Sequence, residues 1–283
     1  MIISVASGKG GTGKTTVAVN MAASLQRSVR FLDCDVEAPN AHLFLHPEIR
    51  ETKPFSVPVP EIHEEKCTYC KKCAQICRFR AIAILEEATL TFPELCHSCG
   101  GCMAVCPEAA ISEIGRNVGE IMIGQAQHIE FVHGKLRVGE AMSPPLIKAV
   151  RKYERPDIVT IIDAPPGTSC PVVAAMKGAD FILMVTEPTP FGLHDLKLAV
   201  GVVRVLGIPC GLVINCSDIG DDRVKQYAET ENIPILMEIP FDRQIAQAYA
   251  RGELLVEALP EWKARFSELY GKVDRMVKQG GQG

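Results

Sequence analysis

Residues 2–16 read Ile2-Ile3-Ser4-Val5-Ala6-Ser7-Gly8-Lys9-Gly10-Gly11-Thr12-Gly13-Lys14-Thr15-Thr16, and this stretch decides the fold. Its apolar start predicts a buried strand over 2–6, and the following residues fit the pattern G-x-x-x-x-G-K-[S/T]. Glycines in such a loop let backbone N–H groups point at phosphate oxygens, and the positive end of the next helix adds to the attraction. The sequence therefore predicts a phosphate-binding loop between a strand and a helix that begins near Lys14.

The loop pattern also assigns individual roles and predicts ATP and Mg²⁺ as ligands. Lys14 is expected to reach the β and γ phosphates, and the hydroxyl of Thr15 is expected to bind Mg²⁺. A glycine-rich structural turn is the alternative, but the flanking strand and helix argue against it. The residues predicted to contact the nucleotide here are Gly8, Lys9, Gly10, Gly11, Thr12, Gly13, Lys14, Thr15 and Thr16.

Short apolar runs alternate with helix-like stretches over most of the chain. After a helix expected over 14–26, the runs predicted as strands are Val29–Asp33, Ile158–Asp163, Phe181–Thr186, Gly211–Asn215 and Ile235–Ile239. Continuous apolar strands separated by helices are typical of a parallel sheet covered on both faces. We therefore expect an α/β fold with a doubly wound, mostly parallel sheet, formed by residues 1–60 and 115–283 around an insert at 61–114.

Composition and charge narrow the class of protein. The 283 residues include 30 Lys and Arg against 34 Asp and Glu, a net charge of −4, which argues against nucleic acid as the main partner. No apolar run approaches the roughly 18 residues of a membrane span, and residues 1–6 do not resemble an export signal. We therefore expect a cytoplasmic protein whose twelve cysteines are metal ligands or redox groups rather than disulfides.

Eight of the cysteines fall in the insert, in two runs of the spacing C-x2-C-x2-C-x3-C. This pattern resembles the bacterial two-cluster ferredoxins, in which the fourth cysteine of each run ligates the other [4Fe–4S] cluster. The resemblance implies a small α+β ferredoxin domain. Zinc is the alternative, but paired C-x2-C sets do not account for the triple spacing. The expected ligands are Cys67, Cys70, Cys73 and Cys106 for the first cluster and Cys96, Cys99, Cys102 and Cys77 for the second.

Two local features accompany the insert. Pro54, Pro58 and Pro60 predict an extended approach to it. Arg78 follows Cys77, where ferredoxins usually have proline. We expect Arg78 to change the local charge, and with it the potential of the cluster that Cys77 would ligate, without removing that cluster.

Lys9 is a second lysine within the phosphate loop, at a position that the general pattern leaves free. The stretch Gly8–Thr16 therefore resembles the deviant phosphate loop of the MinD/Mrp/ParA superfamily, which includes the nitrogenase iron protein. In that superfamily the extra lysine crosses a dimer interface to the nucleotide of the other subunit. The resemblance implies a nucleotide-dependent homodimer, or a heterodimer with a paralogue.

Further matches to this superfamily are the runs Leu32–Asn40, Ile161–Thr168, Val213–Asn215 and Ile239–Asp242, so that the resemblance spans about 1–50 and 135–260. It implies that Asp35 orients or deprotonates the attacking water and that Asp163 holds Mg²⁺, through a water molecule. It also implies that Asn215 contacts the adenine edge and that Pro240 lies in the last loop on the nucleotide side. The catalytic residues implied are Lys9, Lys14, Asp35 and Asp163.

Taken whole, the chain resembles MinD-superfamily ATPases with an inserted ferredoxin domain. The resemblance implies a Mg²⁺-dependent ATPase that couples its nucleotide state to electron transfer through two [4Fe–4S] clusters. The partner would be a redox protein. Two alternatives stay open: an accessory ATPase for assembly or transfer of iron–sulfur or other metal clusters to a client protein, and a MinD-like ATPase that organises complexes.

Two other features leave alternatives open. Cys170 lies seven residues after Asp163, as does a ligand of the bridging cluster in the nitrogenase iron protein. No second cysteine accompanies it, so a buried or interface thiol is favoured over a third cluster. Cys34, Cys210 and Cys216 are expected to be packed residues. The helical spacing of Trp262, Phe266, Leu269, Val273 and Met276 predicts a last helix that packs on the sheet, in preference to a membrane-surface helix.

Overall fold

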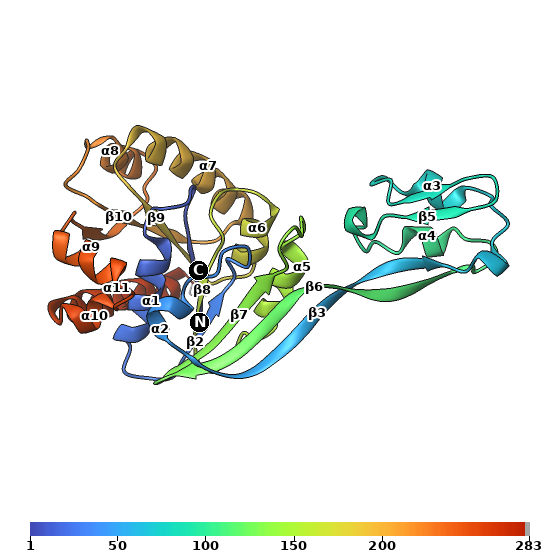
Figure 1. The fold of residues 1–283 in the computed structure, drawn as a ribbon. Coiled ribbons are helices and arrows are strands. Elements are labelled where there is room, and N and C mark those ends of the chain that lie inside the picture. Colours follow the sequence, from blue (N-terminus) through green and yellow to red (C-terminus); the bar gives the residue numbers. More distant parts are fainter. Residues whose placement is uncertain (281–283) are drawn as a thin grey trace. The chain divides into compact units, whose positions relative to one another are not determined.

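The computed structural model describes residues 1–280 and divides the chain into two compact units (Figure 1). The first, which we call the sheet unit, comprises Met1–Lys53, Ile121–Lys135 and the described residues from Ser143 onward. The second, which we call the insert unit, comprises Pro54–Glu120 and Leu136–Met142. The insertion thus interrupts a larger α/β unit.

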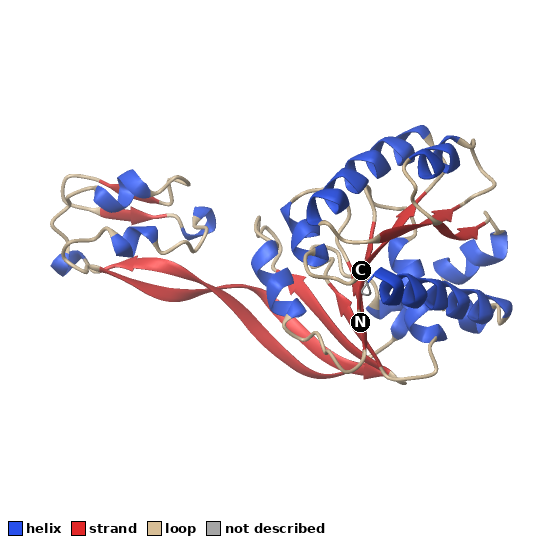
Figure 2. Cartoon of the chain, turned by 180° about the vertical axis from the view of Figure 1, so that it is seen from behind, coloured by secondary structure: helices blue, strands red, loops and turns tan. Residues whose placement is uncertain are grey.

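One sheet of nine strands has the order β11-β10-β9-β1-β8-β2-β7-β6-β3 (Figure 2). The strands are β1 Ile2–Ala6, β2 Val29–Asp33, β3 Glu48–Ile62, β6 Ile111–Ala126, β7 Ile129–Leu136, β8 Val159–Asp163, β9 Phe181–Thr186, β10 Cys210–Asn215 and β11 Ile235–Ile239. The seven from β11 to β7 all pair in parallel. The predicted mostly parallel α/β fold is confirmed.

Helices connect these strands, because parallel neighbours need crossover connections. In the sheet unit they are α1 Lys14–Ser24, α2 His42–Leu45, α5 Pro144–Arg151, α6 Cys170–Met176, α7 Pro190–Leu206, α8 Arg223–Thr230, α9 Arg243–Ala250, α10 Leu255–Ala258 and α11 Glu261–Gly280. Figure 1 shows α1, α9, α10 and α11 together on one side of the strands and α5, α6 and α7 on the other. This is a doubly wound arrangement.

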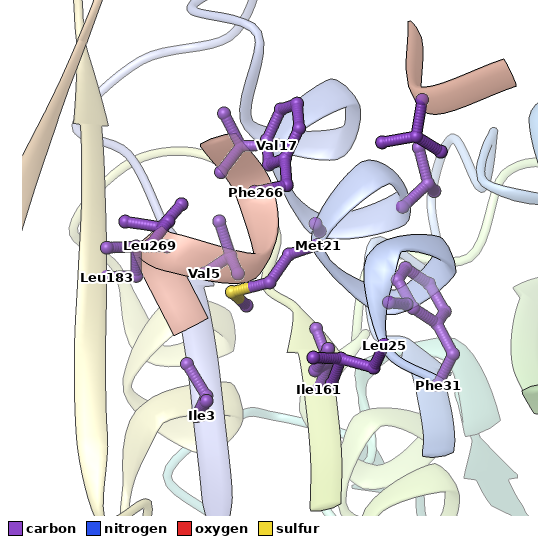
Figure 3. Close-up of a cluster of buried hydrophobic side chains, with 14 of the residues drawn as sticks. Ile3, Val5, Val17, Met21, Leu25, Phe31, Ile161, Leu183, Phe266 and Leu269 are labelled. Carbon is purple, nitrogen blue, oxygen red and sulfur yellow. The ribbon is translucent and has the colours of Figure 1, made fainter. Parts of the chain in front are cut away.

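The core on the α1 side of the sheet explains why these runs are apolar. Successive strand residues point to opposite faces, so Ile3 and Val5 share one face of β1. Figure 3 shows them with Met21 of α1 and with Phe266 and Leu269 of α11, in one cluster of buried side chains. All five are at most 1% exposed. Burying such side chains contributes about 1.5–3 kcal/mol each, which holds α1 and the loop before it against β1.

The last helix, α11, packs against the sheet unit through the residues that the sequence analysis identified. Trp262, Phe266, Leu269 and Val273 are all buried, and they belong to the same apolar cluster as α1. The apolar face of α11 is therefore already covered by protein, as expected for a packing helix. Among residues 1–280, no helix combines the length and the apolar character needed to cross a membrane.

The insert unit consists of two similar halves. Its short elements are the 3₁₀ turns η1 Glu64–Lys66 and η2 Pro93–Leu95, the helices α3 Lys72–Ile76 and α4 Gly101–Ala104, and the antiparallel strands β4 Ile82–Ile84 and β5 Thr89–Thr91. η2 begins 29 residues after η1, and α4 begins 29 residues after α3. The two cysteine runs are separated by the same 29 residues, so the sequence repeat is also a structural repeat.

Candidate functional site

The phosphate loop joins β1 to α1, and its glycines are required by its backbone. Gly11 and Gly13 have φ angles of 81° and 85°, in the left-handed region that side chains disfavour. A Cβ at Gly13 would lie 2.5 Å from the Nδ2 of Asn215, and one at Gly8 would lie 2.2 Å from the backbone oxygen of Asp195. Conformation and close approach therefore both select glycine in this loop.

Lys14, Thr15 and Asp163 form the polar centre of the site. The Nζ of Lys14 donates to Oδ1 of Asp163 at 2.6 Å, and the hydroxyl of Thr15 donates to Oδ2 at 2.7 Å. Burial lowers the pKa of Lys14, but the charge and the hydrogen bond of the fully buried Asp163 raise it by more. The ammonium group is therefore charged, and it lies beside two oxygen groups of the kind that Mg²⁺ prefers.

Asp33 ties the segment after β2 to this centre. It is the register partner of Asp163 on the neighbouring strand β8. Its carboxyl group accepts backbone hydrogen bonds from Asp35 at 3.1 Å and from Ala41 at 3.2 Å. Burial and then the charge of Asp163 raise the pKa of Asp33 well above its ordinary value. The segment that carries Asp35 is thus anchored to the sheet through a buried carboxyl group.

Asp35 is expected to titrate near neutral pH. Burial raises its pKa to about 6, with Lys14 opposing and Asp163 reinforcing the shift. The carboxyl group is therefore protonated below pH 6, and its capacity to act as a base falls as the pH is lowered through that value. A ¹³C NMR titration of the protein without nucleotide should give a midpoint near 6 for a carboxyl resonance that is lost in Asp35→Asn. A midpoint near the ordinary 3.8 would contradict this expectation.

Lys9, the second lysine of the loop, pairs with Glu187 of its own chain. The Nζ of Lys9 lies 3.4 Å from Oε2 of Glu187, which directly follows β9. The Lys9 side chain is 30% exposed, so the ion pair faces solvent and its contribution to folding is small. No local sequence pattern marks Glu187, because its approach to the loop depends on the pairing of β9 with β1.

Asn215 and Pro240 lie at the same edge of the sheet as the loop. Asn215 ends β10, and its Nδ2 donates to the carbonyl oxygen of Thr12 at 3.1 Å. Pro240 directly follows β11, which is parallel to β10. The carboxyl ends of parallel strands form one edge, where ligands bind in open α/β sheets. The structure thus gathers the predicted nucleotide-site residues of the sheet unit at one edge.

His133 belongs to this edge, and the sequence analysis missed it because β7 was not predicted. It is the register partner of Asp33 and is 3% exposed. Burial, followed by the charges of His42 and Lys135, lowers the pKa of His133 to about 4. Its Nε2 lies 3.0 Å from the Sδ of Met122. A neutral ring therefore packs beside the anchored carboxyl group without adding charge to it.

Eight thiols of the insert unit line two cavities. Cys67, Cys70, Cys73 and Cys106 line one of them, which we call the first thiol cavity. Cys77, Cys96, Cys99 and Cys102 line the other, which we call the second thiol cavity. Each cavity receives three cysteines from one half of the repeat and one from the other half. These two sets of four are the sets assigned from the spacing.

Backbone N–H groups approach four of these sulfur atoms in a repeated pattern. The N–H groups of Tyr69 and Ser98 each donate to the Sγ of the cysteine two residues earlier, at 3.4 Å. Those of Ala81 and Ala110 each donate to the Sγ of the cysteine four residues earlier, at 3.3 Å. Hydrogen bonds of this kind stabilise negative charge on sulfur, as the thiolate ligands of a metal cluster require.

The donor sets fit a multinuclear cluster better than a single ion. Tetrahedral zinc requires sulfur atoms about 3.8 Å apart, given a Zn–S bond of about 2.3 Å. Within residues 1–280, no three His, Cys, Asp or Glu side chains converge closely enough to hold one metal ion. Four thiols instead surround each cavity, and an iron–sulfur cluster brings its own sulfide to fill the space between four cysteine ligands.

The four cysteines of the sheet unit are free thiols with different environments. Cys34 is fully buried, and burial raises its pKa well above the ordinary value, as expected of a packed residue. Cys170 is exposed at the start of α6, which contradicts a buried thiol, and the alternative of an interface thiol stays a prediction. Cys210 and Cys216 are partly buried, and burial raises the pKa of each.

Comparisons with known proteins agree with the fold and with a nucleotide-binding domain. Residues 3–256 match the model of the CobQ/CobB/MinD/ParA nucleotide binding domain. An uncharacterized protein of Methanocaldococcus jannaschii is 31% identical over 264 residues, 89% of this chain and 90% of that protein. An iron-sulfur cluster carrier protein of Pyrococcus horikoshii is 26% identical over 98% of this chain and 86% of that protein. The solved structure of the septum site-determining protein MinD of P. horikoshii with Mg-ADP has a TM-score of 0.61 at 21% identity, covering 98% of this chain and 96% of that one, a likeness of fold.

Proposed function

Because the chain belongs to the CobQ/CobB/MinD/ParA family of nucleotide-binding domains, we propose that it is a cytoplasmic Mg²⁺-dependent ATPase that couples its nucleotide state to electron transfer to a partner protein. Two [4Fe–4S] clusters held by the insert unit carry the electrons in this proposal. The observation that carries it is the presence in one chain of the Lys14–Asp163–Thr15 centre and of two cavities with four thiols each.

The ion pair at the polar centre suggests how a nucleotide enters. Phosphate oxygens attract the ammonium group of Lys14. Lys14 then leaves Asp163 and pairs with the phosphates, which frees one carboxylate oxygen of Asp163. Asp163 and the hydroxyl of Thr15 then hold Mg²⁺, which neutralises charge on the phosphates when bound. Asp35 orients the attacking water and accepts its proton, and the raised pKa of this carboxyl group suits it to that task near neutral pH.

Lys9 supports a nucleotide-dependent dimer, either of two identical subunits or with a paralogue. Its ion pair with Glu187 is exposed and weak, so Lys9 can exchange Glu187 for the phosphates bound by a second subunit. Hydrolysis then removes the γ-phosphate contacts that would hold the segment after β2. β3 begins at Glu48, soon after that segment, and leads directly into the insert unit. The chain itself therefore offers a route for coupling.

The name of one group of relatives supports a second candidate function. The P. horikoshii relative and one from Aquifex aeolicus, 26% identical over 92% of this chain, are both named iron-sulfur cluster carrier proteins. In that case ATP turnover would drive the release of a cluster to an acceptor protein. A MinD-like role in organising complexes also fits the fold. Electron transfer is favoured because one chain supplies four thiols to each cavity, and four protein ligands would retain a cluster more firmly than a set shared at an exposed subunit interface.

The decisive experiment is an anaerobic purification followed by iron and sulfide analysis. We expect about eight iron and eight sulfide per chain, four for each cluster. Cys73→Ala should lose about half of both, whereas Cys170→Ala, the matched control in the sheet unit, should lose neither. Zinc in place of iron, or no metal, would overturn the proposal. With ATP added, reversible reduction without loss of iron supports electron transfer, and transfer of iron to an apo-acceptor supports the carrier function.

A further inference from the structure

The two halves of the insert unit place different charges around their thiol cavities. Lys71 and Lys72 line the first cavity, and the residues at the equivalent positions in the second cavity are Gly100 and Gly101. Both pairs follow the second cysteine of a run, 29 residues apart. The backbone conformation is similar at the first of these positions, with φ of 63° and ψ of 2° at Lys71 and φ of 69° and ψ of −2° at Gly100. The halves therefore differ here in charge and not in conformation.

A second pair of equivalent positions differs in polarity. Phe79 and His97 line the second cavity and stack on each other, with ring centroids 3.4 Å apart and an angle of 12° between the planes. The equivalent positions, 29 residues away along the repeat, are Glu108 and Thr68, and both line the first cavity. An aromatic pair thus lines the second cavity where polar side chains line the first. In the opposite sense, Tyr69 lines the first cavity and its equivalent in the second is Ser98.

The charged groups at the two cavities can be compared directly. Those lining the first cavity are Lys71, Lys72 and Glu108, a net charge of +1, and Glu113 alone lines the second, a net charge of −1 with histidine counted as neutral. Arg78, which follows Cys77, adds positive charge near the second set, but neither Arg78 nor Arg80 lines the cavity, whereas Lys71 and Lys72 line the first. Arg116 is neutralised by a bidentate pair with Glu140. The N–H···S hydrogen bonds of the two halves are equal in length.

Charge and solvent access, with hydrogen bonds to sulfur, set the potential of an iron–sulfur cluster. Reduction adds one negative charge, which positive and polar surroundings stabilise and apolar surroundings disfavour. Since the hydrogen bonds match in length, the charges are the main difference, and they favour reduction at the first cavity. The Phe79–His97 pair acts in the same direction, and Tyr69 acts in the opposite one. The negative Glu108 opposes this effect but is outweighed by two lysines.

We infer that Lys71 and Lys72, together with the Phe79–His97 pair, would give the clusters held by the two sets of thiols unequal reduction potentials, and that the cluster held by Cys67, Cys70, Cys73 and Cys106 would accept the electron. This inference rests on the proposed function, because it requires a cluster in each cavity. An external one-electron donor supplies one electron to the protein. At equilibrium this electron would pass from the cluster in the second cavity, which is oxidised, to the cluster in the first cavity, which is reduced. The electron is therefore held in the first half of the repeat.

The test is an anaerobic redox titration of the full chain, followed by electron paramagnetic resonance. The wild type should show two one-electron steps, with at least a tenfold preference for the first cavity, which corresponds to about 59 mV. Lys71→Gly/Lys72→Gly should lower the higher step alone. The reciprocal variant Gly100→Lys/Gly101→Lys should raise the lower step alone. Each variant copies a backbone that the other half already adopts, so both are expected to fold.

Lys71→Gln/Lys72→Gln provides a second variant, which removes the charges but keeps the side-chain length. It should shift the higher step in the same direction as the glycine variant. Equal potentials in the wild type, or a shift of the lower step in either lysine variant, would overturn the inference. Iron content keeps the two claims separate: about eight iron with equal potentials refutes the inference alone, and absence of iron refutes the proposed function.

Discussion

Lys14→Ala is expected to lower kcat/KM for ATP by about 10³-fold or more, the scale on which one cationic group acts in phosphoryl transfer. The same change should lower the free energy of unfolding by about 3–5 kcal/mol, because it leaves the fully buried Asp163 without its ion-pair partner. Steady-state hydrolysis and denaturant unfolding measure the two effects on one preparation. The prediction assigns one side chain both a catalytic and a structural effect.

Lys14→Ala/Asp163→Asn separates these two effects. Removing the carboxylate as well as the ammonium group takes away the uncompensated charge, so most of the lost stability should return. Hydrolysis should stay absent, because the cation that binds phosphate and a proposed Mg²⁺ ligand are both missing. Normal turnover in Lys14→Ala would contradict the catalytic role of Lys14. A Lys14→Ala/Asp163→Asn protein with no greater free energy of unfolding than Lys14→Ala would contradict the structural role of the ion pair.

Lys9→Ala is expected to lower kcat by about 10³-fold while nucleotide binding and stability change little. A cation supplied by a second subunit acts on the transition state, and the exposed pair with Glu187 contributes at most about 1 kcal/mol to folding. Glu187→Gln is the matched control: it frees Lys9 without removing it, and turnover should be retained.

Mixing two inactive variants tests whether Lys9 acts across subunits. In a mixed dimer of Lys9→Ala with Asp35→Asn, one nucleotide site would combine an intact Asp35 with the Lys9 of the other subunit. Activity should therefore reappear on mixing. If both residues served their own subunit's nucleotide, each site would lack one of them, and no activity would return.

Six of the seven parallel strands, all except β7, could be predicted because each is a short apolar run that is largely buried. β1, β9 and β11 have the predicted bounds, and β2 does as well. β3 was read only as an extended approach, since Glu48–Ile62 is mostly exposed and contains Pro54, Pro58 and Pro60. Proline lacks the N–H that an inner strand needs, and β3 is indeed the last strand in the sheet order. Its pattern is that of an edge strand rather than of a core strand.

The site residues could be predicted where they belong to one continuous sequence motif. The loop Gly8–Thr16 and the two cysteine runs carry their spacing with them, so their members could be named without a structure. Glu187 and His133 could not be found in this way. Each reaches the site through strand pairing, β9 with β1 and β7 with β2, and no local pattern marks either residue. The perturbed pKa of Asp35 likewise depends on burial by distant segments.

The exchange of one thiol between the halves of the insert unit makes each half incomplete by itself. Cys106 of the second half completes the first set, and Cys77 of the first half completes the second. If the two sets hold clusters as proposed, the first half could not be filled before the second half has been synthesised as far as Cys106. Completion of both sets therefore depends on the second half of the repeat: a truncated chain ending before Cys102 would complete neither set, and one ending between Cys102 and Cys106 would complete the second set alone.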